Sequence, residues 1–236
     1  MISLQDIKDN SMFIGDTDIS DYGVLVENFK VGATKVDSQV YQGFNRTNFN
    51  VLSSEWSMRP ITVSLFYSAK TRRELSLIKA KIDAMLHGKL DLYLPDNFFY
   101  FAYLESAGEE QIMGVEDNQV IALCSYSFNG IRHDPLEKVE LPAGEVMQCK
   151  STMPKTDCRL ICTASENYES LQIGPVTITD VTQGDVLEVD GIIGRILQNG
   201  APCAGNMSFL HLPYLVPGSN EITCPEDLTV EYYPTY

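Results

Sequence analysis

The sequence lacks several features that would place it in a familiar class of protein. None of its apolar runs approaches the roughly 20 residues that cross a bilayer, which excludes a helical integral membrane protein. Basic residues are few: 17 Lys and Arg stand against 32 Asp and Glu, and the net charge is −15. Because proteins bind nucleic-acid backbones by neutralising phosphates, this balance argues against direct nucleic-acid binding. The N-terminus has no apolar stretch of about 7–15 residues, so we expect no secretory signal.

Six cysteines are present: Cys124, Cys149, Cys158, Cys162, Cys203 and Cys224. Without a secretory signal, reduced thiols made in a cytoplasm are the expected state, and disulfides are the alternative. Cys158 and Cys162 have the spacing of half a metal site, but they belong to an apolar β-type run, CRLICTA. Residues four apart on a strand lie about 13 Å apart, which is too far for two ligands of one zinc ion. We expect no metal site and no cofactor.

No catalytic motif stands out. The sequence contains no G-x-S-x-G, H-E-x-x-H, Walker loop or G-x-G-x-x-G. Of the three histidines, His87 is expected in the last turn of a helix, His133 at the surface in a turn, and His211 in a strand. Four acidic residues lie close together in the chain: Asp180, Asp185, Glu188 and Asp190. They lack the EF-hand pattern, so a solvated face is favoured over a Ca²⁺ site, and we predict that the protein is not an enzyme.

One helix is predicted in the first half of the chain, over residues 71–87. Thr71 and Glu74 fit a capping box, and Gly88 is a suitable stop. An apolar stripe then repeats at the helical period: Leu75, Ile78, Ile82, Met85 and Leu86. Lys79 and Lys81 fall off that stripe, so we expect both to be solvated.

Strands surround this helix in the sequence. Alternating or aromatic β-rich runs predict strands over 60–67, 90–94, 98–104 and 120–128. An order of strand, helix and further strands is typical of an α+β domain with one helix on a sheet. We predict such a domain over residues 1–134.

The chain changes character at Asn129–Pro135, which holds turn residues and a proline. Short apolar runs then recur between turn signals: 158–164, 171–173, 176–181, 186–189, 192–197, 207–212, 220–224 and 228–233. This spacing predicts an antiparallel β-sandwich over residues 135–236, so the fold class is mainly β. Residues 137–157 match no pattern.

The segment 30–58 fits neither domain. It is polar, and isolated aromatic residues punctuate it: Tyr41, Phe44, Phe49 and Trp56. We interpret it as a long hairpin or arm that projects from the N-terminal domain. Its four aromatic residues are candidates for an oligomer interface, and a mobile loop is the alternative.

Two stretches resemble the distal tail protein family of long-tailed bacteriophages and prophages, the Dit family. The first starts at WSMRPITV, continues through the helix to LDLYLPDNFFYFAYL, and ends at VIALCSYSFNGIRHDP. The second is the C-terminal run from Val186, with an Asn-Gly hairpin, the turn LVPGSN and a final strand with paired tyrosines. The second stretch is similar to the end of the family's galectin-like or carbohydrate-module-like sandwich. The arm at 30–58 lies where family members extend a belt-like hairpin.

The resemblance implies a structural protein of the virion, synthesised in the host cytoplasm. Copies would form a hexameric ring between the tail tube protein and the tip, baseplate or receptor-binding apparatus. The N-terminal domain would build the ring, and the sandwich would project as a spacer or attachment platform. The alternative function is a carbohydrate-binding module of an adhesion device, although the C-terminal half has no Trp to stack on sugar rings.

Overall fold

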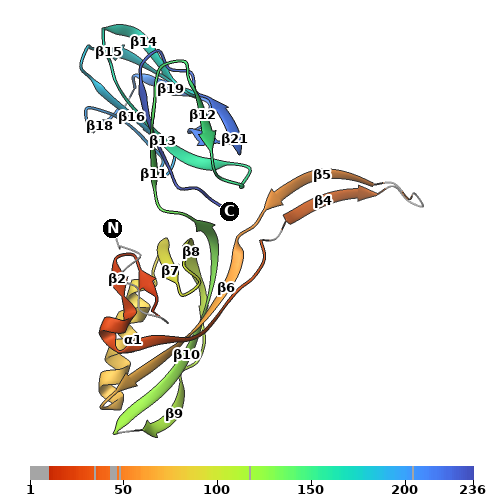
Figure 1. The fold of residues 1–236 in the computed structure, drawn as a ribbon, viewed down its shortest axis with the longest axis vertical. Helices are drawn as coiled ribbons and strands as arrows, with labels where there is room; N and C mark the ends of the chain where they lie inside the picture. The colour runs from red at the N-terminus through yellow and green to blue at the C-terminus, as the bar shows by residue number, and fades with distance from the viewer. Residues whose placement is uncertain (1–10, 35, 43–46, 48, 117, 204) are drawn as a thin grey trace. The chain divides into compact units, whose positions relative to one another are not determined.

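The computed structural model describes residues 11–34, 36–42, 47, 49–116, 118–203 and 205–236. The chain divides into two compact units, Met1–His133 and Asp134–Tyr236. Antiparallel strands make up most of both units, and the described residues contain a single α-helix (Figure 1). The predicted mainly-β class is therefore confirmed. No helix in these ranges has the length and hydropathy needed to cross a membrane.

One antiparallel sheet forms the framework of the first unit, with β9 (Gln111–Glu116) added beside β10. In spatial order its other strands are β2 (Thr17–Asp18), β1 (Phe13–Ile14), β7 (Leu90–Leu94), β8 (Phe98–Ala107), β10 (Gln119–His133), β6 (Arg59–Ala69) and β3 (Val24–Val31). The short 3₁₀-helix η1 (Ile19–Tyr22) leads into β3. Every strand predicted for this domain is present, and β6, β8 and β10 are longer than predicted.

The centre of this sheet is the long ladder between β6 and β10. It runs without a break in register from Val120 opposite Ala69 to Gly130 opposite Arg59. Alternate side chains of β6 point to one face and are buried: Ile61, Val63, Leu65, Tyr67 and Ala69. Because the side-chain period of a strand is two, this apolar face is continuous and needs a cover. The helix provides that cover.

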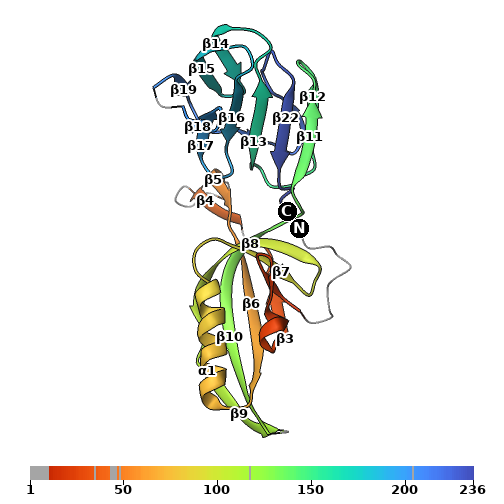
Figure 2. The ribbon, with the colours of Figure 1, turned by 90° about the vertical axis from the view of Figure 1, so that its left-hand side faces the viewer.

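Helix α1 (Arg72–Met85) runs along β10 and β6 (Figure 2), and it begins at the predicted cap, Thr71. The Glu74 N–H donates to the Thr71 hydroxyl at 3.2 Å, and the Glu74 carboxylate accepts the Lys70 N–H at 3.2 Å. From the predicted stripe, Leu75, Ile82 and Leu86 are buried. The helix ends two residues earlier than predicted, because the Leu86 N–H is shared between the carbonyls of Ile82 and Asp83 and the last turn tightens.

Polar contacts fix the docking of α1 on the sheet. The Tyr126 hydroxyl donates to Asp83 at 2.7 Å and shares a 2.8 Å hydrogen bond with the Tyr67 hydroxyl. The Lys79 ammonium lies 2.7 Å from Asp83, and only 20% of its side chain is exposed. The prediction that Lys79 is solvated is therefore wrong, because the carboxylate that anchors the helix also draws this ammonium in. Lys81 is exposed as predicted.

The position of His133 also differs from the prediction. We expected a surface residue in a turn, but β10 continues through His133 because Ile131 and His133 pair with Phe101 and Phe99 of β8. The His133 side chain is 1% exposed. Its ring stacks on Phe101 at 3.7 Å between centroids, and its Nε2 lies 3.2 Å from a carboxylate oxygen of Asp91. The aromatic rings around it, together with the contact to Asp91, explain how an imidazole is buried here.

The second unit is a sandwich of antiparallel strands. One sheet has the order β11 (Glu137–Leu141), β22 (Leu228–Tyr232), β13 (Thr156–Thr163), β16 (Val186–Asp190), β17 (Arg195–Gln198), β18 (Ala201–Pro202), with β20 (Tyr214–Leu215) also paired to β13. The other strands form the ladders β14 (Tyr168–Ile173)–β15 (Val176–Val181)–β19 (Met207–Phe209) and β12 (Val146–Cys149)–β21 (Gly218–Glu221). A single apolar cluster draws side chains from all these ladders, including Leu160, Ile178 and Val230.

Three details of this unit differ from the predictions. Residues 137–157 contain β11 and β12, whose alternation is masked because Glu137 occupies a half-buried position of β11 and Val146 an exposed position of β12. His211 follows β19 and is exposed, because the ladder with β15 ends at Phe209. Residues 192–194 form a turn in which the Gly194 N–H donates to the Asp190 carbonyl, so β17 starts only at Arg195.

Cys158 and Cys162 both lie in β13 and are buried, and all six cysteines are free thiols.

The docking of α1 generates a stability prediction. Ile82→Ala should lower the free energy of unfolding by about 2–5 kcal/mol, because the buried side chain leaves a cavity. Leu77→Ala is the matched control, since Leu77 is 57% exposed on the same helix and its loss should cost no more than about 0.5 kcal/mol. Urea unfolding followed by circular dichroism measures both. Equal losses for the two variants would contradict the docking.

Candidate assembly interface

The candidate interface is the hairpin formed by β4 (Val36–Gln42) and β5 (Phe49–Trp56), here called the arm. Its two strands pair with each other, and within the described residues they join no other strand. The arm extends the β3–β6 ladder in the same register: Val31 lies opposite Ile61, and Val36 lies opposite Trp56. The two ladders therefore belong to one long ribbon (Figure 1).

A glycine stands at the root of the arm. The Gly32 N–H donates to the Pro60 carbonyl at 2.8 Å, which continues the ladder between β3 and β6. A Cβ at residue 32 would lie 2.6 Å from a ring carbon of Pro60. Only glycine lets the two backbones approach this closely beside a proline.

One face of the arm is apolar and exposed. Val36 pairs with Trp56, and Val40 pairs with Val51, while Ser38 lies between them on the same face. Directly opposite residues of an antiparallel ladder project to the same side, so Val36, Val40, Val51 and Trp56 form one stripe, here called the apolar face. About half of each of these side chains is exposed. The pair Gln39–Ser53 and Tyr41 project to the other side.

The predicted interface residues do not all lie on the same side of the arm. Trp56 belongs to the apolar face and is 48% exposed. Tyr41 is 60% exposed but lies on the opposite, polar side. Phe49 is in β5, paired with Gln42, and Phe44 lies outside the described residues. Sequence reasoning followed the aromatic residues and missed Val36, Val40 and Val51, although the alternation in VDSQV could have revealed the first two.

A bulge marks the middle of the arm. The register shifts between Gln39 and Val40, which leaves Leu52 as the extra residue of β5. Leu52 is also largely exposed. The bulge keeps Val40 and Val51 in register with each other, so the apolar face continues past the shift.

A second apolar surface lies at the other end of the same unit. Strand β9 pairs with β10, and three of its side chains are exposed: Ile112, Met113 and Val115. It therefore offers apolar side chains at an edge of the sheet, whereas the arm offers a face. The two surfaces differ in shape and composition.

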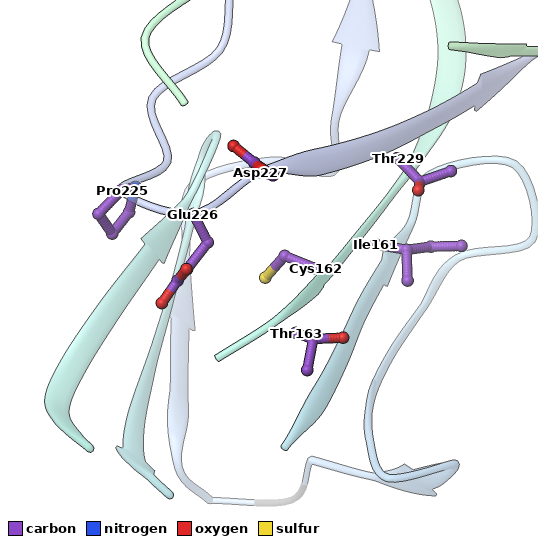
Figure 3. Close-up of a pocket in the computed structure, with 7 residues that line it drawn as sticks. All are labelled: Ile161, Cys162, Thr163, Pro225, Glu226, Asp227 and Thr229. Carbon is purple, nitrogen blue, oxygen red and sulfur yellow. The ribbon is translucent and has the colours of Figure 1, made fainter. Parts of the chain in front are cut away.

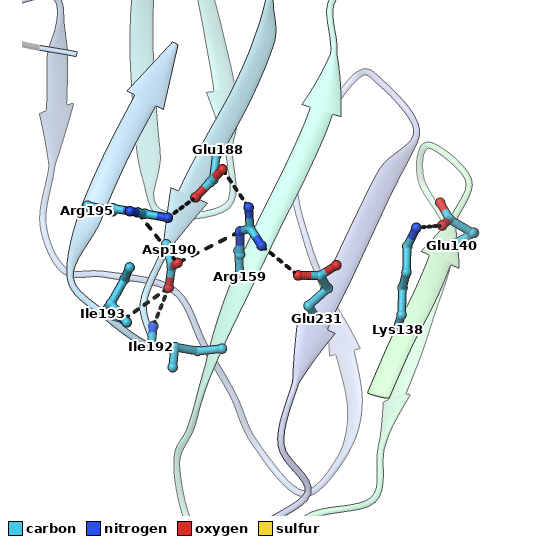
Figure 4. A network of polar contacts seen from close by, with 9 residues as sticks. All are labelled: Lys138, Glu140, Arg159, Glu188, Asp190, Ile192, Ile193, Arg195 and Glu231. Carbon is cyan, nitrogen blue, oxygen red and sulfur yellow. Dashed lines mark hydrogen bonds and ion pairs between the residues drawn. The ribbon is translucent and has the colours of Figure 1, made fainter. Parts of the chain in front are cut away.

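The outward face of the sheet that holds β22, β13, β16 and β17 is charged, and the charges drawn in Figure 4 are paired. The Arg159 guanidinium lies 2.7 Å from Glu188 and 3.0 Å from Glu231, and Arg195 reaches Glu188 at 3.2 Å. The hydrogen bond from Arg159, together with the charges of both arginines, lowers the pKa of Glu188. Glu188 is therefore held ionised.

The acidic residues that the sequence places together do not act as a cluster, because Asp185, Glu188 and Asp190 each bind different partners. Asp190 is buried and accepts the N–H groups of Ile192 and Ile193 at 2.9 and 3.1 Å. Asp185 caps a turn and accepts hydrogen bonds from Thr182 and Asn199. The expectation of a solvated face therefore fails for Asp190, because a tight turn needs its carboxylate. Among the described residues no group of three or more His, Cys, Asp or Glu is arranged to hold a metal ion.

A pocket of about 380 Å³ opens beside the start of β22 (Figure 3). Its lining residues are Ile161, Cys162, Thr163, Pro225, Glu226, Asp227 and Thr229. One oxygen of Glu226 accepts three hydrogen bonds of 2.7 Å, from the Ser165 N–H, the Ser165 hydroxyl and the Tyr168 hydroxyl. Burial opposes ionisation of Glu226, but these donors hold its pKa below the usual value. Its carboxylate therefore anchors a turn.

Comparison with known proteins identifies the fold. No protein-family model matches the chain, and no curated protein matches it by sequence. Among solved structures, the Dit protein of phage SPP1, described as a paradigm of hub adsorption apparatus in Gram-positive infecting phages, aligns with a TM-score of 0.73. The alignment covers 96% of this chain and 98% of that one at 12% identity.

The chain has the Dit fold. Chains of the phage P2 baseplate in its activated conformation also align with it. With Sr the TM-score is 0.58 at 9% identity over 96% of this chain and 98% of that one. With Ca it is 0.56 at 7% identity over 93% of each. The resemblance that the motifs suggested is thus confirmed at the level of the Dit fold, which extends over both units.

The paired charges generate a pH prediction. At neutral pH, Arg159→Met should destabilise the protein by about 1–3 kcal/mol, because Glu188 and Glu231 lose their partner. The pKa of Glu188 is depressed in the folded state, so its contribution is complete above about pH 4.5 and is lost as the pH falls through the folded value. The difference from wild type should therefore shrink on acidification.

Lys138→Met is the control for this prediction. Lys138 pairs with Glu140 at 3.0 Å on the same unit, but both side chains are mostly exposed. Its loss should change the free energy of unfolding by no more than about 0.5 kcal/mol. Urea unfolding between pH 3 and pH 7 measures both variants, and a pH-independent loss for Arg159→Met would contradict the role of Glu188.

Proposed function

We propose that this protein is a structural hub of a phage tail, a distal tail protein. In this proposal six copies form a ring that joins the tail tube protein to the tip, baseplate or receptor-binding apparatus. The observation that carries it is the alignment of nearly the whole chain, both units together, with the SPP1 Dit protein. The protein acts in the virion tail after synthesis in the host cytoplasm, and it has no enzymatic role.

The arm supports self-association. Exposed apolar surface favours burial by about 25 cal/mol per Å², and monomeric proteins rarely leave a contiguous apolar stripe uncovered. The apolar face carries Val36, Val40, Val51 and Trp56, all about half exposed. A second copy of the chain would cover this stripe.

The two apolar surfaces of the first unit suit a closed ring. Rings form from heterologous interfaces, in which one patch meets a different patch on the neighbour. The arm and β9 are dissimilar surfaces on one unit. We propose that the arm contacts the neighbouring copy, and that the first unit (residues 1–133) builds the ring while the second projects from it.

The alternative, a carbohydrate-binding module, draws no support from the outward face of the sheet that holds β22, β13 and β16. Sugar rings bind best on exposed aromatic faces. In the described part of the chain, the outward positions of β22, β13 and β16 carry Glu231, Arg159 and Glu188, which are engaged with one another. Tyr232 points inward and is fully buried.

The ring proposal is tested by light scattering coupled to size-exclusion chromatography at micromolar concentration. Wild-type protein should elute as six copies. Deletion of residues 34–54 should leave both units folded, with a cooperative unfolding transition and a circular dichroism spectrum that loses only the contribution of the arm, and weaken the assembly. A wild-type protein that stays monomeric at all concentrations, alone and with the tail tube protein, would overturn the proposal.

Point variants locate the interface on one side of the arm. Val40→Ser combined with Val51→Ser should raise the dissociation constant at least about tenfold, because covering the exposed halves of these two valines would contribute roughly 1–3 kcal/mol to the contact. The matched control is Gln39→Ala with Ser53→Ala, the adjacent ladder pair on the opposite side. Equal effects of the two double variants would show that the apolar face is not the contact.

A further inference from the structure

Strand β19 forms one edge of a sheet in the second unit. It pairs with β15, which pairs on its other side with β14, and within the described residues no strand pairs with the outer side of β19. Figure 2 shows β19 at the margin of this unit. An edge strand leaves backbone N–H and C=O groups without ladder partners, so it can accept a further strand.

The register of the β15–β19 ladder determines which backbone groups of β19 point outward. The Thr179 N–H donates to the Asn206 carbonyl at 2.8 Å, so these two residues form a hydrogen-bonded pair. Bonded and non-bonded pairs alternate along an antiparallel ladder. Ser208 therefore bonds to β15, whereas Met207 and Phe209 direct their N–H and C=O groups away from it, toward the outer side.

The side chains of the same two residues leave the core open at this edge. Met207 lies opposite Ile178 and Phe209 lies opposite Val176, and both of these partners are fully buried. Directly opposite residues project to the same side of a sheet, so Met207 and Phe209 point to the core side. They are nevertheless 36% and 49% exposed, because no strand of the described ranges continues the sheet beyond them. An added strand would cover both side chains and extend the core.

Two other edges of the sandwich carry features that discourage the addition of a strand. Strand β14, at the opposite edge of the same sheet, exposes Glu169 and Gln172. Strand β18, at the end of the neighbouring sheet, contains Pro202, which has no N–H to donate. Charged side chains and proline protect edge strands from pairing, and β19 has neither.

The charge around this edge favours a basic partner over a second copy of the chain. Asp134–Tyr236 contains 15 Asp and Glu but 5 Lys and Arg. The strands β14, β15 and β19 carry the exposed carboxylates of Glu169 and Asp180 and no Lys or Arg. Two copies that met at this edge would bring like charges together, which costs free energy, whereas Lys or Arg on a partner would be attracted.

We propose that the β19 edge binds an extended, basic segment of another protein, which adds a strand antiparallel to β19. Apolar residues of that segment lie opposite Met207 and Phe209 and cover them, while Lys or Arg at the alternate positions project to the other face of the sheet. Main-chain hydrogen bonds supply affinity, and the alternate side chains supply specificity. This inference goes beyond the proposed ring, because it concerns an edge of the second unit, and its test can fail while the hub function stands.

Labelled peptides test the proposal on the full-length protein by fluorescence anisotropy at about 0.15 M salt. The probe is an end-capped Lys-Val-Lys-Val-Lys-Val-Lys peptide, and its acidic counterpart has Glu in place of each Lys. The basic peptide should bind at least about tenfold more tightly.

Two methylated versions of the basic peptide test the strand geometry. Valines opposite Met207 and Phe209 donate their N–H groups to β19, so N-methylation of the valines should weaken binding at least about tenfold. N-methylation of the lysines, whose N–H groups face away from β19, should change the affinity by less than about threefold. This comparison uses the wild-type protein, so it does not depend on the folding of any variant.

Point variants locate the binding site. Phe209→Ser should weaken binding of the basic peptide at least about tenfold, because the apolar contact is lost. Val146→Ser is the matched control, since Val146 is 52% exposed on β12, outside this sheet, and its loss should leave the affinity unchanged.

Three results would overturn the proposal. The first is the absence of binding up to about 1 mM basic peptide. The second is equal affinity for the two methylated peptides, which would indicate charge attraction without strand pairing. The third is a fall in the number of associated copies on Phe209→Ser, measured by light scattering, which would show that a second copy covers this edge.

Discussion

The antiparallel ladder of β6 is the interaction on which the first unit depends. On one side it pairs with β10 over eleven positions, and on the other with β3, whose register continues into the arm. Because side chains alternate along a strand, this ladder decides which residues face α1 and which do not. A slip of one residue in the pairing would move every side chain of the strand to the opposite face. The register of β6 therefore sets both the core under the helix and the exposed stripe on the arm.

Polar contacts supply the specificity that apolar packing lacks. The hydrogen-bonded set Tyr67, Tyr126 and Asp83 defines one position of α1 on the sheet, and the Arg159 contacts align β13 with β16 and β22. In both places a buried or half-buried polar group has its partners within 3.0 Å, as burial requires. The two units thus combine apolar cores with a few polar contacts that fix register.

In the proposed hub role, the protein acts through its surfaces. The arm leaves apolar side chains in water on one face, while the sandwich covers its outer sheet with neutralised charge. The first unit therefore carries an apolar surface that suits the proposed association, whereas this sheet of the second unit presents paired charges.

Local patterns in the sequence determined the mainly-β class, the capped helix at Thr71 and most strands, because periodicity and turn chemistry act over a few residues. Only the tertiary structure decided the burial of His133 and the strands within 137–157, since each depends on a partner far along the chain. Lys79 and Asp83 are only four residues apart, but Asp83 is held against the sheet by Tyr126, which is distant in the sequence. The same holds for the candidate interface. The aromatic residues marked the arm, but the cross-strand register placed Trp56 with three valines and Tyr41 on the opposite side.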